Sequence, residues 1–266
     1  MIKAAVIGSP ITHSLSPKIH KKAYEILGLE ASYEAIEISE STFLDFYNRL
    51  QSQETGTDWS GFSLTMPLKE IVLKHCTNAD SITVAINSGN TLYRAEDSWK
   101  VTSTDYLAFQ NLLNVAEDAK VAIIGGGGTA RAAIGALNTK VKAVDVLLRA
   151  EGRLPALIKA APNLTVNALD MSKALDDYDL IIQTTPSGVF DEQVSNTARA
   201  NGTLLEAIYK PWPTKLVERY AELGGKVISG KELLVEQALY QIELFSSTKF
   251  DFAKMRADLL SLIALD

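Results

Sequence analysis

The amino-acid sequence predicts an α/β protein of two domains with open, mostly parallel sheets. Short apolar runs that suit buried strands alternate with helix-like segments along most of the 266 residues, and this alternation is typical of parallel sheets with helices on both faces. A glycine-rich turn at 125–128 opens an alanine-rich segment, after which the alternation is repeated. The length suits one large or two medium domains.

The first half of the chain predicts a βαβ unit, a further strand and short helix, and a hairpin. Residues 2–8 suit a buried strand, and Ser14-Leu15-Ser16-Pro17 predicts a helix start with serine as N-cap and proline at the first helical position. That helix should end at Gly28. The other predicted elements are a strand at 31–38, a helix at 42–50, a strand at 61–64, a short helix ending near residue 74, and hairpin strands at 88–94 and 99–103.

The second half starts with a linking helix at 105–113 and continues through the glycine turn. Strands are predicted at 121–124, 144–148, 165–167, 180–184, 203–207 and 226–228, with helices between several of them. Two terminal helices follow, at 231–245 and 252–265. We expect the last helix to pack back on the first domain.

The composition argues against several classes of function. Asp and Glu outnumber Lys and Arg by 32 to 26, and no basic run is present, which argues against nucleic-acid binding. The single cysteine, Cys76, forms no internal disulfide, and with three histidines the chain offers no metal-ligand spacing. No apolar run approaches membrane-spanning length, and the N-terminus lacks the pattern of a signal peptide. We expect a cytoplasmic protein with no metal, no membrane segment and no nucleic-acid partner.

The glycine-rich turn predicts a dinucleotide site. Its residues are Gly125, Gly126, Gly127, Gly128, Thr129, Ala130 and Arg131. Gly125, Gly127 and Ala130 match the pattern G-x-G-x-x-G/A after a predicted strand and before a predicted helix. Glycines permit a tight turn and close approach of a ligand, and the first N–H groups of the helix favour an anion. Four glycines would also suit a flexible loop, but the flanking strand and helix favour a bound pyrophosphate.

The end of the next strand indicates which nicotinamide cofactor binds. NAD-specific sites place Asp or Glu about 20 residues beyond the glycine motif, where the carboxylate accepts a hydrogen bond from the ribose 2′-OH. This chain has Arg149 at that place, and a planar guanidinium suits a 2′-phosphate. Arg153 and Arg131 would add positive charge. The sequence therefore favours NADP(H), while Glu151 leaves room for NAD.

Polar residues stand where predicted strands end or helices begin. They are Ser14, Ser16, Thr65, Lys69, Asn90, Thr91 and Asp105. In open α/β sheets such loops converge at the carboxyl ends of the strands. Hydride transfer between a secondary alcohol and a nicotinamide also moves a proton at the same oxygen, and Lys69 is the candidate acid–base group. Simpler interpretations stay open, since a serine caps helices, Lys69 suits a solvated surface and Asp105 suits an N-cap.

A series of motifs in order resembles the shikimate dehydrogenase family and covers nearly the whole chain. They are 8–20 (GSPITHSLSPKIH), 65–69 (TMPLK), Asn90-Thr91, Thr104-Asp105, the glycine turn, 209–214 (YKPWPT) and Gln237-Ala238. The resemblance implies a substrate-binding and catalytic domain at residues 1–104 plus 238–266. It also implies a Rossmann-type NADP-binding domain at residues 105–237, with the active site in the cleft between the two.

The resemblance also implies an activity and roles for residues. The activity is that of an oxidoreductase of aromatic amino acid biosynthesis, the reversible NADP-dependent reduction of 3-dehydroshikimate to shikimate. Lys69 and Asp105 would be catalytic, and the other substrate-binding residues would be Ser14, Ser16, Thr65, Asn90, Tyr209 and Gln237. The two serines and Tyr209 would hold the carboxylate, and Thr65 would contact the substrate. The ring hydroxyls would be held by Lys69, Asn90, Asp105 and Gln237. We expect a small-molecule substrate and a monomer or homodimer.

The chain departs from the commonest family pattern at several positions. Ser63 and Ser103 stand where asparagine is common, Glu232 stands where glycine is common, and Arg149 is flanked by Leu148 and Ala150 in place of polar residues. Serine keeps a hydrogen-bonding atom but is shorter. Two alternatives therefore stay open: a quinate/shikimate dehydrogenase that uses NAD, and a non-catalytic NADP-binding sensor of the same fold.

Overall fold

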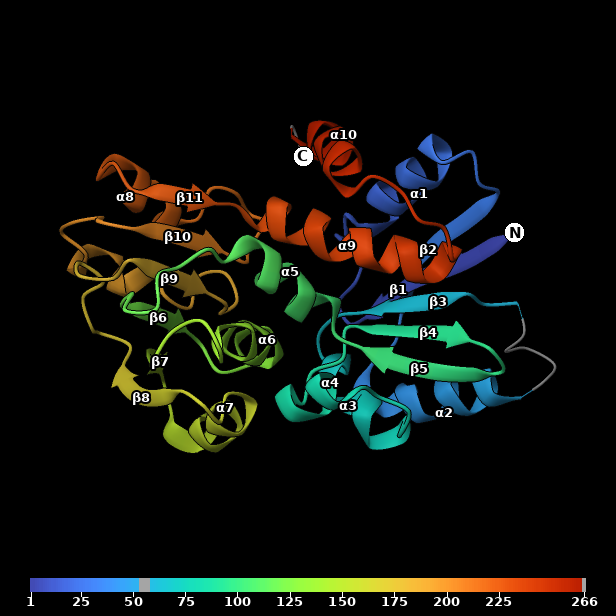
Figure 1. The fold of residues 1–266 in the computed structure, drawn as a ribbon, viewed down its shortest axis with the longest axis horizontal. Helices are drawn as coiled ribbons and strands as arrows, with labels where there is room; N and C mark the ends of the chain where they lie inside the picture. Colours follow the sequence, from blue (N-terminus) through green and yellow to red (C-terminus); the bar gives the residue numbers. More distant parts are fainter. Residues whose placement is uncertain (53–57, 265–266) are drawn as a thin grey trace. The chain divides into compact units, whose positions relative to one another are not determined.

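The protein is represented by a computed structural model that describes residues 1–52 and 58–264 (Figure 1). The chain divides into two compact units. Unit 1 comprises Met1–Thr104 and Val235–Asp266, and unit 2 comprises Asp105–Leu234. Each unit has its own sheet and its own helices, so the predicted α/β class is confirmed.

Unit 1 is built on a five-stranded sheet in the order β2-β1-β3-β4-β5. β1 pairs in parallel with β2 and β3, whereas β3, β4 and β5 are antiparallel neighbours, which confirms the predicted hairpin. The elements are β1 (Ile2–Gly8), α1 (Ser16–Ile26), β2 (Ala31–Glu37), α2 (Glu40–Gln51), β3 (Gly61–Leu64), α3 (Leu68–His75), α4 (Ser81–Ile86), β4 (Thr91–Ala95), β5 (Ser98–Thr102), most of α9 (Gly230–Ser246) and α10 (Phe252–Ile263).

Helix α1 begins differently from the prediction. Its N-cap is Leu15, which makes no side-chain capping bond, so Ser16 and Pro17 are the first residues inside the helix. Ser14 instead accepts the backbone N–H of Ser16 at 3.3 Å from outside the helix. The predicted end is confirmed: the chain leaves the helix through Gly28 at φ +64°, a conformation that glycine adopts without a Cβ penalty.

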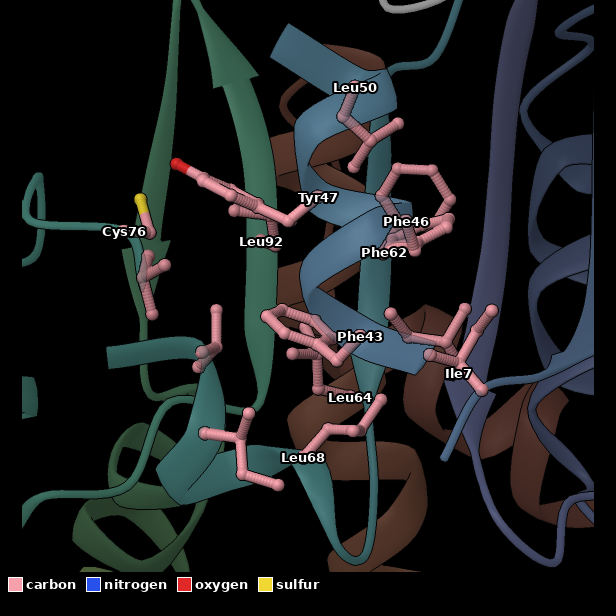
Figure 2. Packing of buried hydrophobic residues seen from close by; sticks show 14 of the residues in the cluster. Ile7, Phe43, Phe46, Tyr47, Leu50, Phe62, Leu64, Leu68, Cys76 and Leu92 are labelled. Atoms are coloured by element: carbon pink, nitrogen blue, oxygen red, sulfur yellow. The ribbon is translucent and has the colours of Figure 1, made fainter. Parts of the chain in front are cut away.

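One face of the unit 1 sheet carries an apolar core (Figure 2). Helix α2 turns Phe43, Phe46, Tyr47 and Leu50 toward the sheet, which is the i, i+3, i+4, i+7 spacing of one helix face. Phe46 meets Phe62 of β3 edge to face, with ring centroids 5.1 Å apart. Burial of such aromatic side chains is the main stabilising contribution on this face.

The opposite face of the same sheet is covered by α1 and α9 and contains buried polar groups. Side chains alternate along a strand, so Phe62 and Leu64 of β3 join the apolar core while Ser63 points to the other side and meets Gln241 of α9. Helix α10 packs on α1, as predicted for the last helix.

Unit 2 has a six-stranded sheet in the order β11-β10-β9-β6-β7-β8, with every described pairing parallel. This is the strand order of the doubly wound dinucleotide fold. Its elements are α5 (Thr104–Leu112, whose first residue belongs to unit 1), β6 (Val121–Ile124), α6 (Gly128–Leu137), β7 (Ala143–Leu148), η1 (Glu151–Arg153), α7 (Leu154–Ala160), β8 (Thr165–Asp170), β9 (Leu180–Gln183), η2 (Asp191–Asn196), β10 (Thr203–Glu206), α8 (Lys215–Glu222) and β11 (Lys226–Ile228).

A buried carboxyl group accepts two hydrogen bonds from the connection after β10. Glu206 accepts the backbone N–H of Ile208 at 3.1 Å and the hydroxyl of Thr214 at 2.9 Å, and the residues between them include Tyr209. The Glu206 side chain is fully buried, and this burial raises its pKa to about 7. The fold therefore favours the protonated form of Glu206 more than the unfolded chain does.

We predict that Glu206→Gln flattens the pH dependence of stability. Because the folded pKa is the higher one, the stabilising contribution is complete below the unfolded value of 4.5 and is lost as pH rises toward about 7. The loss amounts to about 3 kcal/mol over this window. Urea unfolding at a series of pH values measures it.

The exposed Glu222, which pairs at the surface with Arg219, supplies the control. Glu222→Gln should retain the wild-type pH dependence of the free energy of unfolding. Parallel stability curves for wild type and Glu206→Gln would contradict the assignment of the raised pKa to Glu206.

Candidate active site

The carboxyl ends of β1 and β3 lie side by side and form the base of the candidate substrate site in unit 1. Thr65 donates its backbone N–H to Ile7 at 3.0 Å, and Ser9 donates to the carbonyl of Met66 at 3.0 Å. A Cβ on Gly8 would collide with the Thr65 methyl group, so the two chain segments are in direct contact. The segment that leads to Ser14 and Ser16 therefore starts beside the segment that leads to Lys69.

Lys69, Asn90 and the start of α5 are joined by hydrogen bonds. The carbonyl of Lys69 accepts the N–H of Gly89 at 2.8 Å. The next residue, Asn90, accepts the N–H of Thr104 on its Oδ1 atom at 2.7 Å. Lys69 lies in the first turn of α3, and Asp105 follows Thr104 directly in the chain. The hydrogen bonds from Lys69 to Gly89 and from Asn90 to Thr104 thus connect the backbone of the predicted acid–base lysine to the residue that precedes Asp105.

The prediction that Asp105 is the N-cap of its helix is wrong by two positions. Helix α5 begins at Thr104, so Asp105 is its second residue. In this first turn a carboxylate interacts favourably with the positive end of the helix dipole. The Asn90 side chain, from another part of the chain, accepts the N–H that opens this helix. Residues 88–90 also lie outside the hairpin strand predicted to contain them, since β4 begins at Thr91.

The Asn90 carboxamide links Thr104 to Gln237. Its Nδ2 donates to Thr104 Oγ1 at 2.9 Å and to Gln237 Oε1 at 3.2 Å, and the side chain is buried. Gln237 lies on the part of α9 that belongs to unit 1, so Asn90 joins Thr104 and Gln237 to its own loop within that unit. The structure brings together Thr65, Lys69, Asn90 and Gln237 within unit 1, together with Ser14 and Ser16 on the adjoining segment.

Sequence reasoning missed a buried polar cluster behind these residues. Gln241, one turn after Gln237, donates from Nε2 to the Asn90 carbonyl at 3.2 Å and to Thr91 Oγ1 at 3.0 Å. Its Oε1 accepts from Ser63 at 2.6 Å and contacts His20 Nε2 at 3.3 Å. The i, i+4 spacing of two glutamines on an otherwise apolar helix face was the available signal.

His20 has a structural role. It is fully buried, and this burial lowers its pKa to about 3, so the imidazole is neutral. Its ring stacks on Tyr33 with centroids 4.0 Å apart. Tyr33 hydrogen-bonds to Ser63 at 2.6 Å, and Ser63 in turn donates to Gln241, so Tyr33 belongs to the same buried cluster.

The glycine turn in unit 2 has the geometry of an anion cradle. Gly125 has φ +108°, a conformation that L side chains rarely adopt, and a Cβ on it would lie 2.7 Å from Thr184 Oγ1. A Cβ on Gly127 would meet nothing within 4 Å, so the turn is open on that side. Helix α6 starts at Gly128, and the first N–H groups of a helix have no partner within it. These features fit a pyrophosphate at the helix start.

The three predicted arginines differ in exposure. Arg149 and Arg153 are exposed, and a Cβ on Gly126 would lie 2.8 Å from the Arg153 Cβ, so Arg153 packs on the glycine turn. Arg131, in contrast, is buried with 1% of its surface exposed and donates to the Gly126 carbonyl at 3.4 Å. Arg131 therefore supports the turn from within, while Arg149 and Arg153 present charge at its surface.

The other unit 2 positions have local partners. Tyr209 lies on the β10–α8 connection, which is held by the two hydrogen bonds that Glu206 accepts. Glu232 accepts the N–H of Ser229 at 2.7 Å, and Ser229 Oγ accepts the N–H of Glu232 at 3.3 Å, which is a capping box at the start of α9. Glu232, where glycine is common, thus stabilises the beginning of this helix.

The described residues offer neither a metal-binding cluster nor a membrane-spanning helix. Within 1–52 and 58–264, no group of three or more His, Cys, Asp or Glu side chains has the arrangement to hold a metal ion. In the same part of the chain, no helix has the length and apolar character needed to span a membrane.

Comparisons with known proteins agree with this architecture. A family model described as the shikimate dehydrogenase substrate binding domain matches residues 6–92. A shikimate dehydrogenase (NADP(+)) of Exiguobacterium sp. is 30% identical over 255 residues, which cover 93% of this chain and 94% of that protein.

Two solved structures show the same likeness over both units. The shikimate dehydrogenase of Mycobacterium tuberculosis superposes with a TM-score of 0.86 at 30% identity, covering 98% of this chain and all of that one. The Thermus thermophilus enzyme in complex with NADP(H) and shikimate has a TM-score of 0.83 at 26% identity and covers 99% and 100%. The chain belongs to the shikimate dehydrogenase family.

Proposed function

We propose that this protein is an NADP-dependent shikimate dehydrogenase, which reversibly reduces 3-dehydroshikimate to shikimate in aromatic amino acid biosynthesis. The observation that carries the proposal is the bonded segment Lys69–Gly89–Asn90–Thr104, which attaches an acid–base lysine and the residue before Asp105 to one site. Family membership supports the substrate, and the exposed arginines near the glycine turn support the cofactor.

We assign separate tasks to the two parts of the chain. Residues 1–104 and 238–266 form the substrate-binding and catalytic domain, and residues 105–237 form the Rossmann-type domain that binds NADP(H). The single cysteine suits a reducing compartment, so we infer a cytoplasmic enzyme that acts as a monomer or homodimer.

The residues of unit 2 fit NADP(H). The positive φ of Gly125 and the open side of Gly127 make room for the pyrophosphate, and Gly126, Gly128, Thr129 and Ala130 complete the turn. Arg149 and Arg153 would hold the 2′-phosphate, with Arg131 beneath the turn. When bound, the cofactor supplies the hydride acceptor for alcohol oxidation and the hydride donor for the reverse reaction.

The chain's own residues bind the substrate and move the proton. Lys69, as the neutral amine, removes the proton from the hydroxyl that is oxidised, and as the ammonium it returns the proton in the reduction. Asp105 orients Lys69 and a substrate hydroxyl. Ser14, Ser16 and Tyr209 bind the carboxylate, Asn90 and Gln237 bind the ring hydroxyls with Lys69 and Asp105, and Thr65 contacts the substrate.

A matched set of assays tests the proposed activity. Purified protein is incubated with shikimate or quinate and with NADP⁺ or NAD⁺, and the nicotinamide absorbance is followed. We expect the highest rate with shikimate and NADP⁺. A preference for quinate and NAD⁺ would favour the quinate/shikimate dehydrogenase that uses NAD. Binding without turnover would favour a non-catalytic sensor. No change in absorbance in any of the four mixtures would overturn the proposed activity.

We predict that Lys69→Ala lowers kcat by at least about 100-fold, because general acid–base groups contribute on the order of 10²–10⁴-fold, and that it changes KM for shikimate much less. Steady-state kinetics in both directions measure the two parameters. Lys74→Ala, at an exposed position on the same helix, is the control and should keep wild-type kcat. Near-wild-type kcat for Lys69→Ala would rule out its acid–base role.

We predict that Arg149→Ala raises KM for NADP⁺ by roughly tenfold or more, the effect of losing a hydrogen bond to a charged group, and leaves KM for NAD⁺ nearly unchanged. Arg199→Ala removes an exposed arginine that pairs with Asp177 and should change neither KM. An equal rise of KM for both cofactors would show that Arg149 does not recognise the 2′-phosphate.

A further inference from the structure

The connection between β10 and α8 begins at a buried acidic residue and carries Tyr209, the proposed carboxylate ligand. Glu206 is the last residue of β10. Its Oε1 atom accepts the backbone N–H of Ile208 at 3.1 Å, and its Oε2 atom accepts the hydroxyl of Thr214 at 2.9 Å. One carboxyl group therefore joins the two ends of the segment 208–214. Tyr209 directly follows the first of these two attachment points.

The backbone that leads to Tyr209 is also held by other parts of unit 2. Ala207 donates its N–H to the Gln183 carbonyl of β9 at 2.9 Å. A Cβ on Gly230, at the start of α9, would lie 2.5 Å from the carbonyl carbon and oxygen of Ile208. Real Cβ atoms do not approach a backbone so closely, so the absence of a side chain at Gly230 permits this contact. Residues 207 and 208 are therefore closely confined, and Tyr209 continues from them.

The carboxyl group of Glu206 is not needed by the elements on either side. Thr214 caps α8 with its own side chain, which accepts the N–H of Val217 at 3.2 Å, and β10 pairs with β9 and β11 through its backbone. A fully buried position is ordinarily occupied by an apolar residue, because burial of a carboxyl group costs free energy unless hydrogen bonds compensate. What Glu206 adds in return is the attachment of both ends of the segment 208–214.

We propose that Glu206 is a positioning residue for substrate binding, which holds Ile208 and Thr214 together and thereby fixes the place of the Tyr209 hydroxyl. The inference rests on the proposed function, because it takes Tyr209 as a ligand of the substrate carboxylate. A hydrogen bond weakens steeply as its distance and angle depart from the optimum, so a ligand on a loosened segment binds less well. Glu206 has no exposed surface, so it acts through Tyr209 and not by touching the substrate.

A double-mutant cycle on shikimate binding tests the proposal. Shikimate is titrated calorimetrically into protein saturated with NADPH, a pair that cannot react because both partners are in the reduced form. We expect Tyr209→Phe and Glu206→Ala each to raise Kd for shikimate about tenfold, the effect of losing one hydrogen bond to a charged group. The double variant should bind no more weakly than Tyr209→Phe, because no hydroxyl is left to position. Independent effects would instead multiply to about 100-fold.

Two further variants of the same attachment extend the cycle. Glu206→Gln keeps an oxygen that accepts the Ile208 N–H and places an amide nitrogen beside the Thr214 hydroxyl, so it should restore nearly wild-type binding of shikimate. Thr214→Val releases one end of the segment and leaves Glu206 in place, and it takes the place of Glu206→Ala if that variant does not fold. Its loss of affinity should likewise disappear in the Tyr209→Phe background.

Asp176 supplies a matched control within unit 2. Its carboxylate also accepts two hydrogen bonds from one connection, the backbone N–H groups of Ala198 at 2.6 Å and Arg199 at 2.9 Å. That connection precedes β10, whereas Tyr209 follows it. Asp176→Ala should therefore leave Kd for shikimate unchanged. Kd for NADP⁺ should keep its wild-type value in every variant, because the glycine turn is not part of the attachment.

The proposal is overturned if the effects of Glu206→Ala and Tyr209→Phe multiply, if either variant leaves Kd for shikimate unchanged, or if Asp176→Ala weakens binding equally. Turnover of shikimate and NADP⁺ by the wild-type protein is measured in parallel. Coupled effects on binding without turnover would overturn the proposed activity and leave the positioning role standing. Turnover with multiplying effects would do the reverse, and a wild-type protein that does not bind shikimate would overturn both.

Discussion

The contact between the Gln241 amide and the Asn90 carbonyl is the constraint on which the candidate substrate site depends. It fixes which end of the carboxamide donates, and thereby the tautomer of His20 and the direction of the Ser63 hydrogen bond. The same Asn90 accepts the first N–H of α5 and holds Gln237 on α9. A polar core of this kind stabilises one arrangement strongly, because a partner that is removed leaves a buried group unsatisfied.

The two faces of the unit 1 sheet have different roles: one holds the apolar core, and the other supports the candidate site. Phe62 and Leu64 point to the aromatic side chains of α2, where burial of apolar surface supplies stability without directional demands (Figure 2). Ser63, between them in sequence, points to α9 and joins the hydrogen-bonded cluster. Alternation along one short strand therefore places the apolar core and the support of the site on opposite faces of the same sheet.

Local patterns in the sequence predicted the strands, the glycine turn and the helix end at Gly28, because these depend on apolar runs and backbone freedom within a few residues. The start of α5 depends on a distant partner, because the Asn90 side chain accepts the N–H of Thr104, and the predicted cap at Asp105 was wrong for that reason. At α1 the cap position falls on Leu15, and Ser14 accepts the N–H of Ser16 from outside the helix. The short α4, capped by Asp80 at 2.8 Å, carries too few residues for a periodic signal. Gln241 meets residues 178 positions away, which no local pattern reveals.

Nitrogen-15 NMR of the histidine side chains in the ligand-free protein tests this account most directly. If Gln241 is oriented as described, His20 is a neutral imidazole with its hydrogen on Nε2, and its signals do not titrate between about pH 5 and 8, where an ordinary histidine changes charge. Gln241→Glu, which removes the amide nitrogen that defines the orientation, should disturb the His20 signals, whereas Tyr24→Phe should leave the tautomer unchanged. A His20 that titrates near its usual pKa, or one with its hydrogen on Nδ1, would contradict the account.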